Sequence, residues 1–202
     1  MSAARRAALA VAALTALAFG VRLVGIGFGV PLWEEGDAHF PGHVDLIRRG
    51  GGGARLTSDE IQYPSLVPRC VALLPEWPMP PPGSGAEAHL AAARGTFVQV
   101  RVFIALLSVL VVPLTYRLAR SAAPRGWALW AAAIPAASLL HLCFSQQARP
   151  HAAAASVFLA TIHACLHLRR HPSGWAYLGA GLLCALSVGC LHSGAMMLLP
   201  LA

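Results

Sequence analysis

The sequence contains no lysine, and it contains no aspartate or glutamate outside one window of its length. All eight carboxylates fall between Glu34 and Glu87, whereas the basic residues, all of them arginine, occur along the whole chain. Only 11% of the residues are charged, compared with about a quarter in soluble domains. An ionised carboxylate is costly in hydrocarbon, so a membrane-embedded chain keeps its acids where water is. We therefore expect residues 31–96 to form one large loop outside the membrane, and any acid–base chemistry to occur there.

Long apolar runs occupy most of the remaining sequence, in which 57% of all residues are hydrophobic. A helix that crosses a bilayer needs about 20 consecutive apolar residues. Five runs approach this length, at residues 7–30, 98–116, 127–144, 152–168 and 175–199. The sequence thus predicts an all-α polytopic membrane protein with about five transmembrane helices, organised as a single membrane domain over residues 1–202.

The first apolar run has two interpretations. Arg5 and Arg6 followed by an Ala/Leu-rich stretch are typical of a cleaved signal peptide. However, the apolar character resumes after Arg22 and continues to Val30, which is longer than the apolar core of most signal peptides. This length favours an uncleaved first span.

The large loop contains two stretches with helical potential. Residues 63–74 are half apolar and too short to span a bilayer, so we expect an interfacial helix against the membrane surface. Residues 37–49 are expected to form a second short helix. The glycine run at 50–53 breaks the chain between the two stretches, and the proline-rich segment at 75–85, which cannot be helical throughout, follows the second.

The arginines predict the orientation in the membrane, because short loops rich in arginine stay on the cytoplasmic side. Arg5 and Arg6 precede the first span, and further arginines occupy the connections at 117–126 and 169–174. We therefore expect a cell inner-membrane protein with a cytoplasmic N-terminus and an extracytoplasmic loop 31–96. The turn at 145–151 should face the same compartment as that loop. Because the arginines flank apolar runs, the positive net charge does not indicate nucleic-acid binding.

Five short motifs occur in a recognisable order. They are WEEGD at 33–37, YPSL at 63–66, YRLAR at 116–120, SQQARPH at 145–151, and CLHSGA followed by LLPL at 190–201. Together they resemble motifs of the GT-C glycosyltransferases, in the branch that contains protein O-mannosyltransferases and bacterial aminoarabinose transferases. The resemblance implies a GT-C-like N-terminal part and transfer of a sugar from a polyprenyl-phosphate donor in the bilayer to an acceptor hydroxyl or amine outside it. No complete set of metal ligands is evident, so we expect no cofactor, although other GT-C branches use a divalent metal.

The resemblance also suggests which residues act. Asp37 matches the loop acid of the family and would accept the proton of the attacking acceptor, although an Asp at this place also suits a helix cap. Arg149 would hold the donor phosphate with its planar fork of donors, or else it extends to the membrane interface. His151 would assist proton transfer. Tyr63 and Glu35 would line the substrate site, and Arg22 would either pair with an outer acid there or extend its side chain to the interface.

Three positions depart from the family motifs. Ala38 stands where a second acid is usual, His151 where the turn normally ends in an acid, and Leu191 where a lysine is expected. The chain also stops directly after an apolar run. These departures leave open an alternative, in which the chain is a truncated, inactive homologue that serves as a membrane scaffold or as a partner subunit of a larger transferase.

Histidines repeat every four residues at His163, His167 and His171, so they share one helix face. Such spacing can bind zinc or haem and would suit a small transporter or metal channel, but histidines are also common where a span ends. The five cysteines show no paired spacing and are expected to be apolar packing residues.

Overall fold

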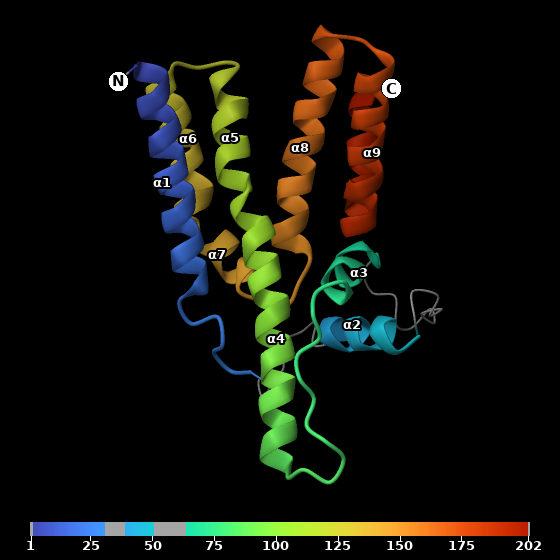
Figure 1. Cartoon of the computed structure of the whole chain (residues 1–202). Coiled ribbons are helices and arrows are strands. Elements are labelled where there is room, and N and C mark those ends of the chain that lie inside the picture. The colour runs from blue at the N-terminus through green and yellow to red at the C-terminus, as the bar shows by residue number, and fades with distance from the viewer. Residues whose placement is uncertain (1, 31–38, 51–63, 202) are drawn as a thin grey trace.

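The computed structural model of the chain describes residues 2–30, 39–50 and 64–201. Within these ranges the protein is helical and has no strand. Its long helices are α1 (Ala3–Leu23), α4 (Ala86–Val109), α6 (Arg125–Ala137), α8 (His151–Arg170) and α9 (Gly174–Cys190). Shorter elements are α2 (His39–Gly50), α3 (Leu66–Ala72), α5 (Val111–Arg120), α7 (Leu139–Ser145) and the 3-10 helix η1 (His192–Leu201). The long helices run roughly side by side, and α2 and α3 lie across one end of them (Figure 1).

Several apolar helices are compatible with the expected multi-pass membrane protein. In the described part, α1, the continuous pair α4–α5 and α8 are long and apolar enough to cross a bilayer. A fourth span results if α6 and α7, which meet at an angle of 53°, are counted as one bent helix. The apolar α9 has 17 residues and is shorter than the others. Three to four candidate spans are therefore present, and the fifth stays a prediction.

Helix starts follow from residues that the sequence places there. The Ser2 Oγ accepts from the backbone N–H of Arg5, and the Ser173 Oγ accepts from that of Ala176, so serine side chains cap α1 and α9. Pro124 and Pro150 directly precede α6 and α8. Proline suits this position because the first backbone nitrogens of a helix have no partner within it.

The first span is shorter at its C-terminal end than the apolar run predicted. Helix α1 ends at Leu23, whereas the run continued to Val30. Gly25 and Gly29 have φ angles of 74° and 73°, which other residues rarely adopt, and residues 24–30 form successive turns. The glycines, which apolarity alone does not register, therefore end the helix.

The second span begins earlier than predicted. Helix α4 starts at Ala86, inside the stretch expected to be loop up to residue 96, and the pair α4–α5 is continuous over 35 residues. At 1.5 Å per residue this is about 50 Å, well beyond the ~30 Å of a hydrocarbon core. Figure 1 shows the first half of α4 extending past the other long helices, with the chain that precedes it alongside. Gly95 lets the Trp77 ring of that chain lie directly on α4.

The last apolar run was expected to form one span over residues 175–199. The structure divides it instead. Helix α9 ends at Cys190, Leu191 is extended, and η1 then folds back along α9. Gly194 lies so close to the Ser187 carbonyl that a Cβ atom could not fit. The predicted fifth span is thus divided between a 17-residue helix and a returning segment.

The two short loop helices are present, as α2 and α3, and they pack against the protein; the position of α3 at the bilayer surface stays a prediction. Val44 of α2 and Val67 and Val71 of α3 are buried. They join a core with Val100 and Ile104 of α4 and with alanines of α8. Burial of this apolar surface attaches the described part of the loop to the end of the bundle.

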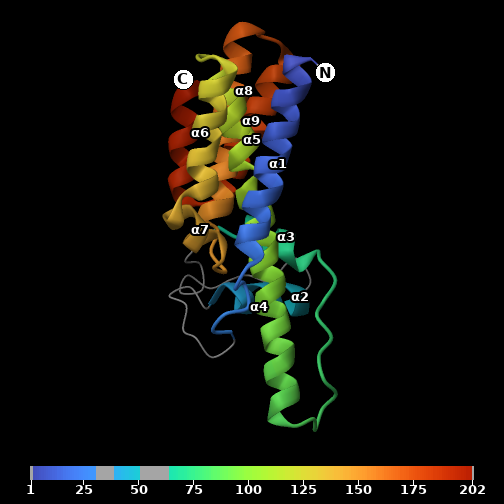
Figure 2. The ribbon, with the colours of Figure 1, turned by 90° about the vertical axis from the view of Figure 1, so that its left-hand side faces the viewer.

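The arginine-rich connections lie together, far from α2 and α3. The start of α1, the α5–α6 connection and the α8–α9 connection meet at one end, and Figures 1 and 2 show this from two directions. We call this the arginine-rich end. Helices α2 and α3 and the turn before α8 lie at the other end of the bundle, which we call the loop end.

Candidate functional site

Three of the predicted site residues, Asp37, Glu35 and Tyr63, lie outside the described residues. Their proposed roles stay predictions. The other three, Arg22, Arg149 and His151, are described, and all three lie in the half of the bundle nearer the loop end. The local geometry of this region is therefore built from the end of α1, from α6 and α7, and from the turn at 145–150.

Arg22 is completely buried near the end of α1. Its Nη1 donates to the Ala18 carbonyl at 2.8 Å. Its Nη2 donates to the Pro135 carbonyl at 3.2 Å and to the His141 Nδ1 at 2.9 Å. Among the described residues its partners are thus backbone and imidazole, not an acid or the membrane interface. Whether Arg22 also contacts a substrate stays a prediction.

Arg22 can contact Pro135 and His141 because the helix is interrupted between α6 and α7. Pro135 has no N–H and its ring displaces the backbone of the preceding turn, so the helix weakens there. Ser138 then begins α7, its Oγ accepting from the His141 N–H at 3.3 Å. The bend leaves the Pro135 carbonyl without its usual partner one turn later, and the Arg22 guanidinium takes that place.

The protonation of His141 follows from its partner. A guanidinium has only donors, so the His141 Nδ1 must accept from Arg22. The ring is therefore neutral in this arrangement, with its proton on Nε2. Neither Pro135 nor His141 was a candidate from the sequence, although a proline followed by a capping serine inside an apolar run was a visible sign of a helix break.

Two further side chains hold the segment that leaves α1. Gln146, at the end of α7, donates from Nε2 to the carbonyls of Arg22 at 3.2 Å and of Val24 at 2.6 Å. Arg101 of α4, only 4% exposed, donates from Nη1 to the carbonyls of Ile26 at 2.6 Å and Phe28 at 3.0 Å. Residues 24–30 are consequently attached on one side to α7 and on the other to α4.

Arg149 and His151 lie where the turn enters α8. Both are half-buried, and the His151 ring lies 5.7 Å from the Phe144 ring between centroids. The same turn begins with Gln146, which contacts the end of α1. The structure thus brings the Arg149–His151 turn to the place where the chain leaves α1 towards the acidic segment.

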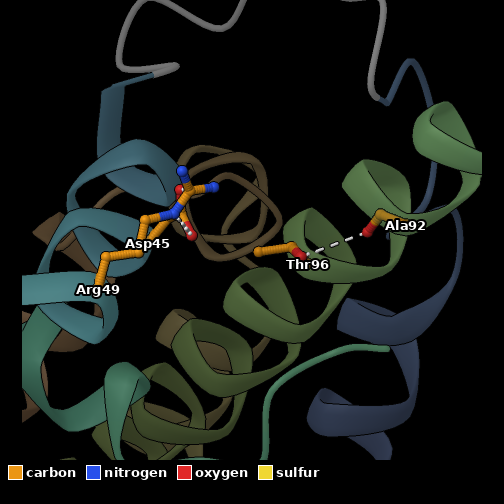
Figure 3. A network of polar contacts seen from close by, with 4 residues as sticks. All are labelled: Asp45, Arg49, Ala92 and Thr96. Carbon is orange, nitrogen blue, oxygen red and sulfur yellow. Dashed lines mark hydrogen bonds and ion pairs between the residues drawn. The ribbon is translucent and has the colours of Figure 1, made fainter. Parts of the chain in front are cut away.

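Asp45 is the loop acid whose surroundings are best defined. Both of its oxygens pair with Arg49 one turn later, at 3.1 Å to Nε and 2.9 Å to Nη2 (Figure 3). The two side chains are 42% and 73% exposed, so this is a solvated ion pair on α2. Glu76 and Glu87 are exposed as well. These three acids are therefore exposed to solvent and need no buried partner.

The repeated histidines lie on α8 near the arginine-rich end. The His163 Nε2 donates to the Leu114 carbonyl of α5 at 2.8 Å, and the His167 and His171 rings are 5.1 Å apart between centroids. No group of three or more His, Cys, Asp or Glu in the described part of the chain is arranged to hold a metal ion. The five cysteines are free thiols.

Comparison of the chain with models of protein families, with characterised proteins and with solved structures finds no match. What this region does must therefore be argued from its own residues.

Proposed function

We propose that this chain is a membrane glycosyltransferase of GT-C type, which transfers a sugar from a polyprenyl-phosphate donor to an acceptor on the extracytoplasmic face. In this proposal five helices cross the membrane, with α9 as a short fifth span near the lower length limit of about 17 residues. The N-terminus and the arginine-rich end are cytoplasmic. The loop end, with residues 31–96, faces the outside of the cell inner membrane.

The observation that carries the proposal is the contact between Gln146 and the end of α1. Through it, the turn that contains Arg149 and His151 lies where the chain departs towards Asp37, with the Gln146 Nε2 only 2.6 Å from the Val24 carbonyl. Arg101 holds the next residues against α4. The turn that carries a cation for the phosphate therefore lies against residues 22–24, from which the chain continues in sequence to Asp37, and this supports the proposal.

The reaction needs two groups that this chain can supply. The acceptor hydroxyl or amine must lose a proton as it attacks the anomeric carbon, and the Asp37 carboxylate is the base. The departing lipid phosphate keeps the bonding electrons and gains negative charge, which the Arg149 guanidinium stabilises by bidentate hydrogen bonds. Tyr63 and Glu35 line the site, and His151 assists proton transfer.

Sugar transfer by membranes that contain the full chain tests the proposal. We expect transfer from a polyprenyl-phosphate sugar, with a loss of about 100-fold or more in Asp37→Asn because a general base typically contributes that factor. Asp45→Asn is the matched control, since it removes a paired, solvated acid of the same loop. Transfer by Asp37→Asn at the wild-type rate would remove Asp37 from the mechanism.

Cysteine labelling tests the orientation independently of activity. In a background without the five native cysteines, single cysteines at positions 37 and 149 should react with a membrane-impermeant reagent added from outside. A cysteine at position 170 should react only after permeabilisation. Labelling of 37 and 149 from opposite sides would overturn the transferase proposal.

An inactive homologue that partners a larger transferase is the second candidate. Ala38, His151 and Leu191, which replace charged residues of the family motifs, favour it. Co-purification with a larger transferase, together with no turnover by the isolated chain, would support this alternative over the first.

A further inference from the structure

A groove runs between α4–α5 on one side and α8–α9 on the other. One part is a cavity of about 370 Å³ whose exposed walls are mostly apolar, with Leu107 and Leu110 among them, and Arg117 lies at its edge. A second cavity of about 510 Å³ adjoins it towards the arginine-rich end. The two cavities form one groove along the helices, because they share the lining residues Leu114, Arg117, Ala160 and Leu183.

The second cavity is basic. Arg117 of α5 and Arg170 of α8 line it, together with His163, His167 and His171. The ring of His163 is fixed in place, because its Nε2 donates to the Leu114 carbonyl across the groove at 2.8 Å. The groove therefore changes along its length from a mostly apolar part to a rim of donors and positive charge.

No acid of the described residues neutralises this rim. Asp45, Glu76 and Glu87 belong to α2, to the chain before α4 and to the start of α4, all at the loop end (Figure 1). The segments that meet at the arginine-rich end contain arginine but no carboxylate anywhere in their sequence. Counter-charge for Arg117 and Arg170 must therefore come from outside these segments.

Compensation of the helix dipoles explains only part of this pattern. The last turns of α5 and α8 carry basic residues, which offset the partial negative charge of the helix ends. Arg120, for example, donates from Nη1 to the Ala123 carbonyl just beyond its helix. Arg117 and Arg170 instead line the cavity, where a phosphate could accept from them.

We propose that this groove is a binding site for an anionic phospholipid, with an acyl chain between α4–α5 and α8–α9 and the phosphate at Arg117 and Arg170. Charge complementarity decides the occupant, since the apolar part suits a hydrocarbon chain and the rim suits a phosphate. The lipid belongs to the leaflet at the arginine-rich end, away from Arg149. Such a site would exist whether or not the chain transfers sugar.

Native mass spectrometry of the purified full chain tests the charge of the site. Titration with phosphatidylglycerol should give binding about tenfold tighter than titration with phosphatidylcholine of the same acyl chains, a difference of about 1.4 kcal/mol. In Arg117→Gln/Arg170→Gln this preference should fall to about twofold or less. The matched control, Arg120→Gln/Arg169→Gln, removes the same charge from the same two helix ends and should keep the preference.

A second pair of variants tests the apolar part without changing charge. Ala160→Phe fills the region common to both cavities and should weaken the binding of both phospholipids by about tenfold. Ala185→Phe adds the same ring on the exposed face of α9, outside the groove, and should leave binding unchanged. Thermal melting checks that each variant is folded. If Ala160→Phe melts at a lower temperature than the wild type, Ala160→Leu takes its place.

Several results would overturn the proposal. Equal losses in the two arginine pairs would mean a diffuse basic surface rather than this groove. Equal affinity for the two phospholipids would remove the role of charge. Displacement of the lipid by glycerol phosphate would indicate a site for a soluble phosphate, and a preference for polyprenyl phosphate over phosphatidylglycerol would make the occupant a different lipid.

Discussion

Arg22 and Arg170 differ in almost every physical respect, although both belong to helices of the same bundle. Arg22 is completely buried and its guanidinium is held by two carbonyls and an imidazole. Arg170 is exposed in the last turn of α8 and lines an open groove. Near the loop end, buried arginine side chains donate to backbone carbonyls at helix ends, where the usual helical partner is missing. At the arginine-rich end, the Arg170 side chain is exposed and lines the groove.

The difference arises from what surrounds each charge. A buried charged group costs several kcal/mol to desolvate, so it persists only where enough hydrogen bonds compensate. The bend at Ser138 and the turns after Leu23 supply such carbonyls near Arg22 and Arg101. An exposed arginine at a helix end keeps its water and needs no such partner.

The largest effect should follow removal of the buried guanidinium. In Arg22→Met the Pro135 carbonyl and the His141 Nδ1 lose their donor, and we expect the free energy of unfolding to fall by roughly 2–3 kcal/mol. Denaturation in bicelles, followed by tryptophan fluorescence, measures this change.

Arg22→Lys is the informative companion to that variant. It keeps the charge but replaces the planar fork by a single ammonium, so the loss should be intermediate. Unchanged stability in Arg22→Met would mean that burial alone, without the hydrogen bonds, holds α1 against α6.

A smaller and more local effect should follow loss of the Gln146 amide. In Gln146→Ala the carbonyls of Arg22 and Val24 lose one donor, which should cost about 1 kcal/mol. Hydrogen exchange should become faster in residues 24–30.

Thr96→Ala is the control for this local effect. The Thr96 hydroxyl donates only within its own helix, to the Ala92 carbonyl at 3.3 Å (Figure 3), so exchange of residues 24–30 should not change. If exchange in Gln146→Ala is unaltered, the Gln146 amide does not stabilise residues 24–30, and this prediction is wrong.

The smallest effects should occur at exposed charges. Asp45→Asn removes a solvated pair one helical turn apart, worth about 0.3–0.5 kcal/mol, and salt should reduce this further. Arg169→Gln should change the free energy of unfolding even less. The same denaturation experiment measures both, and a loss in either as large as that of Arg22→Met would contradict the contrast between the two environments.

Much of the fold was predictable from the sequence. The positions of α1, α6 and α8 follow from apolar runs, and the short helices α2 and α3 were expected within the loop. The errors lie at helix ends. Gly25 and Gly29 end α1 early, and the close approach of Gly194 to Ser187 accompanies the return of η1 along α9. Such ends depend on single backbone conformations, which the average apolarity of a run does not register.

The candidate site was less predictable. Arg149, His151 and Arg22 were identified by motif or by position, but His141, Gln146 and Arg101 were not. Nothing in the sequence near these three indicates what they contact, because their partners lie far away along the chain: the Arg22 guanidinium for His141, and backbone carbonyls for Gln146 and Arg101. The acid-bearing residues Asp37 and Glu35, and Tyr63, lie outside the described part of the structure, so their roles await the experiments above.

The sequence by itself determined that this chain is helical, apolar and divided into an acid-bearing segment and arginine-flanked runs. It could do so because the cost of charge in hydrocarbon and the length of a span are properties of local composition. Only the tertiary structure decided that Arg22 meets Pro135 and His141, and that Arg117 and Arg170 line one groove. These contacts join residues more than fifty positions apart, and they exist only after the helices have packed.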